Sequence, residues 1–454
     1  MKFILCLLIL SCCYANDDTI SVILNGFNPN GSTKKGTFGI AEKENLIVRA
    51  AKVLGVPDGF DDPYAKNQIV QVAYYGDTPP QYYTAEDIKE IEAAGKGTPR
   101  YALVAAKFIK RRLELTKASG VSLGGGSYGA LIGRYLIENN LENLAAEGKI
   151  KKWLTLEGVV CGAWAAGLSA DKDIREFVEE VLGLDISDPK TMHHQWVNEN
   201  IHNPHTETNC EYFKDILIGH YISSNDRLNE QLLTFATNRP NDGVLLVDDM
   251  YLHKVAPQSR FRGRMPAKVI GNTTHLSATK DEIFLQNIVS FVRGTRRVTI
   301  KLLQGKASQF DEDENWYGDA EVVFQAKVYS PYIKEKWNID KEIALVNREN
   351  HTAKVIKFGK SRDSKAIEST LFDWFVNPEE KSLKLELWAE EVDWDDMYKI
   401  EEDIMNPYED LGKTQIEIPL DFRGKKLFQA KSEKWGVSIV VEIDDYSSPV
   451  NESK

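Results

Sequence analysis

A glycine-rich corner between a strand pattern and a helix pattern constrains this chain more than any other feature. The stretch VSLGGGSYGALIGRYLIE (residues 121–138) reads as a short buried strand before Ser127, and after it apolar residues recur at helical spacing. Glycine stands two residues to either side of the serine, at Gly125 and Gly129. Side chains at those positions would collide in so tight a turn. The pattern predicts a serine hydroxyl raised above the edge of a sheet at the start of a helix.

Strand-like runs alternate with helical stretches from Asp17 to Gly294. Such alternation is typical of a mostly parallel sheet covered by helices on both faces. We therefore expect an α/β catalytic domain over residues 16–296. Between Ala163 and Pro240 the pattern loosens into helices and polar loops, which predicts a cap or lid at about 163–240. The expected strands are 19–26, 67–76, 121–126, 151–160 and 267–274, with a further strand-like segment at 215–223 inside the cap range, and the expected helices are 99–115, 128–138 and 280–294.

After Val298 the apolar period changes to two. Several short alternating strands with polar connections predict an all-β sandwich over residues 297–445, followed by a disordered tail, 446–454. The expected strands are 296–305, 320–330, 341–350, 382–392, 413–422 and 435–445.

Charge is distributed unevenly between the two parts. The formal net charge of the chain is −12, of which −1 falls in residues 1–300 and −11 in residues 301–454. This asymmetry indicates two modules with different surface chemistry. It argues against a nucleic-acid partner, because phosphates would meet a repulsive field.

The first residues, MKFILCLLILSCCYAND, combine a lysine, a short apolar run and a small residue at Ala15. The run is too short to span a bilayer, so residues 1–15 are interpreted as a secretory signal peptide cleaved after Ala15. The alternative is a bacterial lipoprotein anchored at Cys12. Beyond the signal only Cys161 and Cys210 remain, either as one disulfide or as two free thiols.

Gly125 to Gly129 fits the pattern G-x-S-x-G, and the flanking strand and helix supply the context that the pattern needs. The alternative, a phosphate-binding loop, lacks the Lys-Ser/Thr ending. The segment GGGSYGALIGRYL resembles the nucleophile turn of triacylglycerol lipases of the α/β-hydrolase fold, and the resemblance covers about residues 19–294. It implies a serine hydrolase in which Ser127 is the nucleophile.

Two backbone amides are candidates for binding the oxyanion of the reaction. The turn places the amide of Tyr128 at a helix N-terminus, where it can donate to a developing negative charge. The resemblance implies a second amide, that of Phe27, at the end of the first strand. Here Asn25-Gly26-Phe27 stands where the family has His-Gly-X, so Asn replaces the usual His.

A serine hydroxyl needs a base and an orienting carboxylate, which in this fold follow in the order Ser, Asp, His. His275 lies on a loop between the last strand and the last helix, where the family carries its base. The other candidate base, His253, reads as helical surface. For the acid, Asp242 in Asn-Asp-Gly resembles the lipase acid loop, and Asp226 is the main rival. Asp248 and Asp249 are interpreted as a solvated helix start.

Two groups of residues are candidate metal ligands. Four histidines lie close together in the expected cap, and some relatives bind zinc there, although a wet polar loop explains them equally well. In the β-sandwich, carboxylate-rich loops supply oxygen ligands of the kind that Ca²⁺ prefers. The strand order and the segment LKLELWAEEVDWDD resemble the calcium- and lipid-binding domains of protein kinase C and synaptotagmin, although a solvated acidic face explains the loops as well. The histidines are His193, His194, His202 and His205, and the candidate calcium ligands are Asp311, Asp313, Asp393 and Asp395.

Together these features predict a secreted serine hydrolase that cleaves carboxylic esters, in particular lipid esters, without a cofactor for the chemistry itself. Its partners would be an ester or lipid substrate and a lipid surface. The alternatives are a lipid acyltransferase that uses the same three residues, and a catalytically inactive lipid-binding or adhesion protein.

Overall fold

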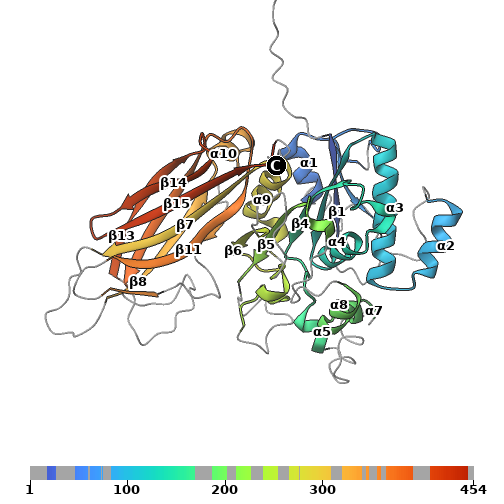
Figure 1. The fold of residues 1–454 in the computed structure, drawn as a ribbon, viewed down its shortest axis with the longest axis horizontal. Coiled ribbons are helices and arrows are strands. Elements are labelled where there is room, and N and C mark those ends of the chain that lie inside the picture. The colour runs from blue at the N-terminus through green and yellow to red at the C-terminus, as the bar shows by residue number, and fades with distance from the viewer. Residues whose placement is uncertain are drawn as a thin grey trace, which may run out of the picture.

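Two units make up the fold, an α/β unit and a β-sandwich (Figure 1). The computed structural model describes residues 18–26, 46–59, 62–72, 74, 83–168, 187–201, 211–225, 239–253, 265–275, 277–307, 320–339, 344–346, 355–358, 364–391 and 409–447. The expected signal peptide and most of the expected tail lie outside these ranges.

The α/β unit is built on a parallel sheet of six strands in the order β2-β1-β3-β4-β5-β6. Its strands are short apolar runs that are buried along almost their whole length, as helices on both faces require. The expected α/β fold followed by a β-sandwich is therefore confirmed. The strands are β1 (Thr19–Leu24), β2 (Ile69–Val72), β3 (Gly120–Gly126), β4 (Ile150–Leu156), β5 (Leu217–Ser223) and β6 (Ala267–Gly271).

Helices cover the two faces of this sheet in pairs. Alternate side chains of β1 show the division, because Ile23 packs in one core with α1 and α9 whereas Val22 packs in the other with α3 and α4. All parallel strands end at the edge where α5, α7 and α8 lie, the lower edge in Figure 1. The helices are α1 (Leu46–Leu54), α2 (Ala85–Ala93), α3 (Thr98–Thr116), α4 (Tyr128–Glu138), α5 (Trp164–Leu168), α7 (Ser187–Met192), α8 (His194–Asn200) and α9 (Glu282–Arg293). No helix in the described ranges is long and apolar enough to cross a membrane.

The predicted cap range, 163–240, is too broad. It includes β5, which pairs with β4 on one side and β6 on the other and so belongs to the sheet. Within the described residues, the α-helices of that range are α5, α7 and α8. The segment DILIGHYIS before Asp226 reads as a strand in the sequence, and β5 (Leu217–Ser223) confirms it; what the sequence does not show is that this strand belongs to the parallel sheet and not to the cap.

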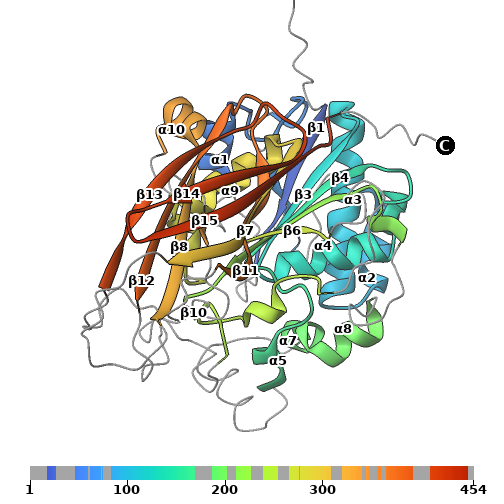
Figure 2. The ribbon, with the colours of Figure 1, turned by 60° about the vertical axis from the view of Figure 1, so that its left-hand side comes forward.

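Two antiparallel sheets face each other in the β-sandwich (Figure 2). One has the order β10-β8-β12-β13 with β9 beside β8, and the other the order β11-β7-β15-β14. The sequence did not reveal β11, in part because two register shifts in its pairing with β7 break the alternation. The elements are β7 (Arg296–Ala307), β8 (Ala320–Tyr329), α10 (Pro331–Trp337), β9 (Ala344–Val346), β10 (Val355–Phe358), β11 (Lys365–Val376), β12 (Ser382–Glu391), β13 (Glu409–Pro419), β14 (Gly424–Lys431) and β15 (Trp435–Asp445).

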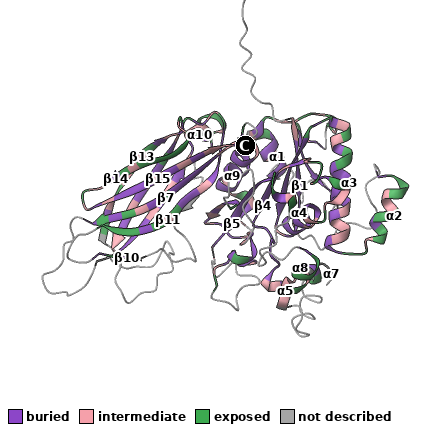
Figure 3. Ribbon diagram, in the orientation of Figure 1, coloured by how far each residue is buried: buried purple, intermediate pink, exposed green. Residues whose placement is uncertain are grey.

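Buried residues are present in both units (Figure 3), and one hydrophobic core contains residues of both. Trp374 of β11 is fully buried, its ring centroid lies 5.5 Å from that of Phe291 on α9, and its indole N–H donates to the carbonyl of Asn287 (3.1 Å). Arg297 of β7 is also buried, where it pairs with Asp373 and donates to the carbonyl of Met265 (2.7 Å). Helix α9 therefore covers the parallel sheet on one side and holds the sandwich on the other.

Trp374→Ala is expected to reduce the free energy of unfolding by about 3–5 kcal/mol, because it removes the ring at the centre of this shared core. Urea unfolding followed by tryptophan fluorescence and by circular dichroism measures the change. Trp388→Ala, at a half-buried position of the same sandwich, is the control and should cost clearly less. A Trp374→Ala protein whose α/β unit unfolds at the wild-type midpoint would show that the two units are energetically independent.

Candidate active site

Ser127 stands at the corner between β3 and α4 with φ 48° and ψ −124°, a backbone conformation that non-glycine residues rarely adopt. Holding such a conformation costs about 1–3 kcal/mol. The surroundings fix it, because the amide of Ser127 donates to Leu156 O (3.0 Å) and its carbonyl accepts from Val159 N (2.9 Å) and Ala130 N (3.1 Å). The serine is thus held at the carboxyl edge of the sheet.

The flanking glycines let three backbone segments meet at this corner. A Cβ atom on Gly125 would lie 2.5 Å from the carbonyl oxygen of Gly129, and one on Gly129 would lie 2.4 Å from the carbonyl oxygen of Leu24. Both distances are far below van der Waals contact, so side chains are excluded by backbone that cannot move aside. The predicted reason for glycine at these positions agrees with the structure.

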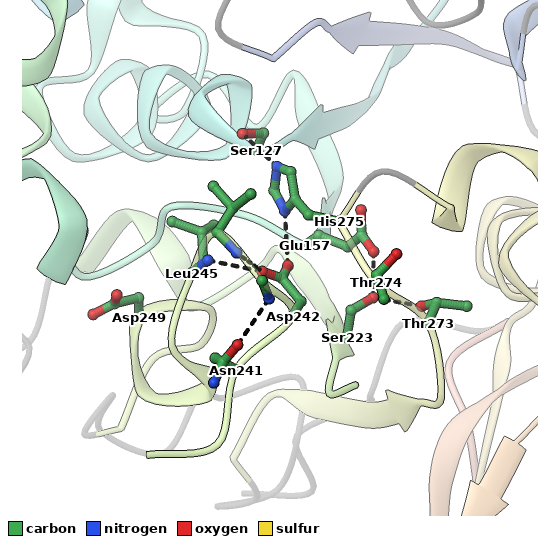
Figure 4. Close-up of polar contacts among 12 residues, drawn as sticks. Ser127, Glu157, Ser223, Asn241, Asp242, Leu245, Asp249, Thr273, Thr274 and His275 are labelled. Atoms are coloured by element: carbon green, nitrogen blue, oxygen red, sulfur yellow. Dashed lines mark hydrogen bonds and ion pairs between the residues drawn. The ribbon is translucent and has the colours of Figure 1, made fainter. Parts of the chain in front are cut away.

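His275 joins Ser127 to Asp242 in a single row of hydrogen bonds (Figure 4). Its Nε2 lies 3.1 Å from Ser127 Oγ, and its Nδ1 lies 2.7 Å from Asp242 Oδ2. The imidazole side chain is 13% exposed, whereas the Asp242 side chain is fully buried. Ser127 and Asp242 are 115 positions apart in the chain, and Asp242 and His275 are 33 apart. The fold nevertheless brings the three together in the arrangement that a nucleophile, a base and an orienting acid require.

The loop after β5 fixes the carboxylate of Asp242. Its second oxygen, Oδ1, accepts from the amides of Val244 (2.9 Å) and Leu245 (2.7 Å). The carbonyl of Asp242 accepts from the amide of His275 (2.9 Å), so the two residues are joined through backbone as well as side chain. Three N–H donors and one backbone link leave the carboxylate little freedom to rotate.

The charge of Asp242 acts strongly on His275. Burial opposes protonation of the imidazole, but the charge and hydrogen bond of Asp242, with a further contribution from Glu157, outweigh it and raise the pKa of His275 to about 9 from an ordinary 6.5. Such a histidine readily accepts a proton.

Glu157 is a residue near this row that sequence reasoning missed. It follows β4 directly, it is 3% exposed, and its side chain extends past His275 with the carboxyl directed toward Ser223 (Figure 4). Burial raises its pKa, the charge of Asp242 raises it further, and His275 and a hydrogen bond from Ser223 oppose that rise. The available signal was a single acidic letter in the otherwise apolar and small segment WLTLEGVV.

One of the two predicted oxyanion amides lies in the described part of the chain. Tyr128 is the first residue of α4, and its side chain is buried with its hydroxyl 2.8 Å from both Thr98 Oγ1 and Thr191 Oγ1. Phe27 lies outside the described residues. Its neighbour Gly26 passes close to the serine, since a Cβ atom there would lie 3.0 Å from Ser127 Cβ.

Among the described residues, the alternative base and the other candidate aspartates from the sequence do not take part in this row of hydrogen bonds. His253 bonds through Nε2 to the carbonyl of Asp248 (2.7 Å), in a bend and not on a helix, and Asp226 lies outside the described residues. The interpretation of Asp249 as solvated is wrong, because it is 2% exposed and accepts from His194 Nε2 (2.8 Å) and from the amide of Trp164 (2.9 Å). Asp249 thus ties α5 and α8 to the loop that carries Asp242.

No group of three or more potential metal ligands lies among the described residues. His193 accepts from the amide of Gln195 at the start of α8, and His194 pairs with Asp249. The remaining predicted ligands lie outside the described residues: His202, His205, Asp311, Asp313, Asp393 and Asp395. Cys161 is a buried free thiol that donates to the carbonyl of Tyr251 (3.0 Å), and burial raises its pKa to about 12, whereas Cys210 is not described.

Comparison with known proteins gives similarity of fold. No family model matches the sequence, and no curated protein matches it in sequence. The mature form of the lipase BlEst2 from Bacillus licheniformis is 11% identical with a TM-score of 0.38, over 58% of this chain and 88% of that one. Phospholipase PlaB from Legionella pneumophila is 11% identical with a TM-score of 0.37, over 81% and 85%. A C2-type domain of a plant extended synaptotagmin is 11% identical with a TM-score of 0.22, over 34% and 99%. Function is therefore inferred below from the site itself.

Asp242→Asn is expected to lower the pKa of His275 from about 9 toward its ordinary 6.5, because burial is then opposed only by the smaller contribution of Glu157. An NMR titration of the imidazole measures this shift. Asp248→Asn is the matched control, since Asp248 is 56% exposed and pairs with Arg239, and it should leave the titration unchanged. Equal titration curves for Asp242→Asn and wild type would contradict the assigned pairing.

Proposed function

We propose that the protein is a serine hydrolase that cleaves carboxylic esters through Ser127, His275 and Asp242. The observation that carries the proposal is the position of His275, whose two ring nitrogens lie 3.1 Å from a strained, partly exposed serine hydroxyl and 2.7 Å from a buried carboxylate. A serine with no such role has no need of this conformation or of a base within hydrogen-bond reach.

The geometry supports acyl transfer in two steps. Ser127 Oγ bonds to the ester carbonyl carbon while its proton moves to His275 Nε2, and the same proton passes to the leaving alkoxide as the ester C–O bond breaks. A water molecule then gives a proton to Nε2 and its oxygen bonds to the acyl carbon, after which Ser127 leaves with that proton. Asp242 keeps the Nδ1–H tautomer and stabilises the imidazolium. The amides of Tyr128 and Phe27 are proposed to bind the oxyanion, and each such donor contributes about 2.7–4 kcal/mol in known cases.

We further propose that the ester is a lipid ester and that the protein is secreted. Asp249 connects helices α5 and α8 to the loop that carries Asp242. These helices lie at the edge of the sheet where the substrate would enter, an arrangement that suits a substrate taken from a lipid–water interface. Secretion is inferred from residues 1–15 alone, with lipid anchoring at Cys12 as the alternative.

Ser127→Ala is expected to lower the rate of hydrolysis of p-nitrophenyl esters by about 10³–10⁶-fold and to abolish labelling by a fluorophosphonate. The wild-type rate should rise with pH as His275 loses its proton, with a midpoint displaced to the alkaline side of 6.5. Added acceptor alcohol distinguishes a hydrolase from an acyltransferase by the ratio of free acid to new ester. Ser122→Ala, a buried serine in β3, is the control. Equal and negligible activity and labelling of wild type and Ser127→Ala would favour the inactive lipid-binding alternative.

For the β-sandwich we propose calcium-dependent docking on a lipid surface. The strand pairing brings the end of β12 beside the start of β8, since Glu391 lies opposite Val322, and in the sequence the expected acidic segments follow the one and precede the other. At that end Glu390 lies opposite Asp410 across β12 and β13, and burial together with Asp410 raises the pKa of Glu390. Paired like charges are unfavourable unless a cation lies near them. This pair supports the proposal of a cation site at that end, whose further ligands would be Asp311, Asp313, Asp393 and Asp395.

Millimolar Ca²⁺ is expected to stabilise the protein against heat and to bring it onto vesicles that contain anionic lipid. At a Ca²⁺ concentration 100 times the Kd, the stabilisation should be about 2.7 kcal/mol. Calorimetry and vesicle sedimentation measure the two effects, with Mg²⁺ as the control ion. Replacement of the four aspartates by asparagine should remove both effects. If that variant responds to Ca²⁺ as the wild type does, the ligand assignment is wrong.

A further inference from the structure

Glu157 is a buried carboxyl near the proposed catalytic residues that has no role in the reaction as described. It follows β4 at the carboxyl edge of the sheet, between the strand that ends at Ser127 and the strand β5 that precedes the acid loop. Its backbone has φ 49°, and its amide donates to the carbonyl of Tyr221 (2.9 Å). The left-handed conformation turns the chain at this point, and the side chain is buried beside the row formed by Ser127, His275 and Asp242 (Figure 4).

A chain of three buried hydroxyls ends on the Glu157 carboxyl. Ser223 Oγ donates to Glu157 Oε1, Ser223 Oγ lies 2.6 Å from Thr273 Oγ1, and Thr273 Oγ1 lies 3.2 Å from the Tyr221 hydroxyl. A hydroxyl has one proton to donate. When Glu157 is ionised, Ser223 gives its proton to the carboxylate, so Thr273 donates to Ser223 and Tyr221 donates to Thr273. All three O–H dipoles therefore point toward Glu157 and favour its negative charge.

The protonation state of Glu157 depends on several groups that act in opposite directions. Burial and the charge of Asp242 favour the neutral acid, whereas the hydroxyl chain and a protonated His275 favour the carboxylate. The charged and titratable groups that act on this cluster are Asp242 from the acid loop, Tyr221 from β5, and Asp281 at the start of α9, which acts on Tyr221. A buried carboxyl next to another carboxyl is costly unless a cation forms between them. The proposed reaction forms that cation at His275.

We propose that Glu157 is a positioning residue that acts through His275: with Asp242, it stabilises the positive charge that the imidazole gains when it takes the proton of Ser127. This inference rests on the proposed function. Both ring nitrogens of His275 already have partners in Ser127 and Asp242, so Glu157 acts through its charge across the buried site. In such a site a fixed charge has a much larger effect than it would have in water.

Glu157→Gln tests the proposal, because it keeps the shape of the side chain and removes the charge. The pKa of His275 should fall, since Glu157 contributes to raising it, and the acid limb of kcat/KM should move by about one pH unit toward lower pH. At the wild-type optimum kcat should fall about tenfold while KM stays within about twofold, because the lost interaction belongs to the transition state. The pH dependence of fluorophosphonate labelling should move with the same limb.

Two further variants separate charge from structure. Ser223→Ala removes the donor to Glu157 and leaves both carboxyls, so it should shift His275 in the same direction as Glu157→Gln but by less. Glu380→Gln is the matched control: Glu380 is a buried carboxyl in the sandwich that accepts from Ser330 Oγ and from the amide of Tyr332 (3.0 Å). It should lower stability and leave every pH profile unchanged.

An NMR titration of the His275 imidazole distinguishes failure of this proposal from failure of the proposed function. If wild type neither hydrolyses esters nor reacts with fluorophosphonate, the proposed function fails, and the titration still reports whether Glu157 acts on His275. If wild type is active and Glu157→Gln has the wild-type titration and pH profile, the role of Glu157 is overturned. Should Glu157→Gln fail to fold, an unchanged titration in Ser223→Ala overturns it instead.

Discussion

The candidate site depends first on the backbone conformation of Ser127. A φ of 48° is unfavourable for serine, and the structure maintains it because β1, β3 and the first turn of α4 approach one another at backbone-to-backbone distance. This contact requires glycine at positions 125 and 129. It also fixes where the other partners must be, since a serine held at the carboxyl edge of a parallel sheet can be reached only by loops that leave the same edge. Asp242, His275 and Glu157 all follow strands at that edge.

Burial of charge is the second constraint. Asp242 is inaccessible to solvent, and hydrogen bonds from two amides and from His275 compensate the loss of hydration. Glu157 has no comparable set of amides and depends on a serial chain of hydroxyls. Burial raises the pKa of Glu157, so its charge responds to the state of the imidazole.

Local sequence allowed Ser127, Asp242 and His275 to be chosen, because each lies in a short pattern: a glycine-flanked serine, an Asn-Asp-Gly turn, and a histidine between the last strand and the last helix. Glu157 and Asp249 have no such pattern. Their importance arises from partners 66 and 55 residues away, Ser223 and His194, which no local pattern could reveal.

The same reason limited the prediction of the fold. Strands with a regular apolar pattern, such as β1 and β15, were found close to their observed ranges. The sequence does not reveal β11, whose register shifts break the alternation, and it indicates β5 as a strand but places it within the cap range, because the pairing of β5 with β4 and β6 cannot be read from the segment itself. Gly219 has no room for a side chain, since a Cβ atom there would lie 2.5 Å from the Phe291 ring and 2.8 Å from the Trp374 ring.

The contact at Gly219 also bears on how such a protein can change over evolutionary time. A ring from the sandwich extends past α9 to the backbone of a strand in the parallel sheet, so the two units are in direct contact at this point. An accessory domain joined only by a linker can be lost, duplicated or exchanged by recombination without harm to its neighbour. This sandwich cannot, because its removal would leave an apolar hollow over β5 and α9. Relatives of the chain should therefore keep both units together or have neither, and residues 219, 291 and 374 should vary in concert.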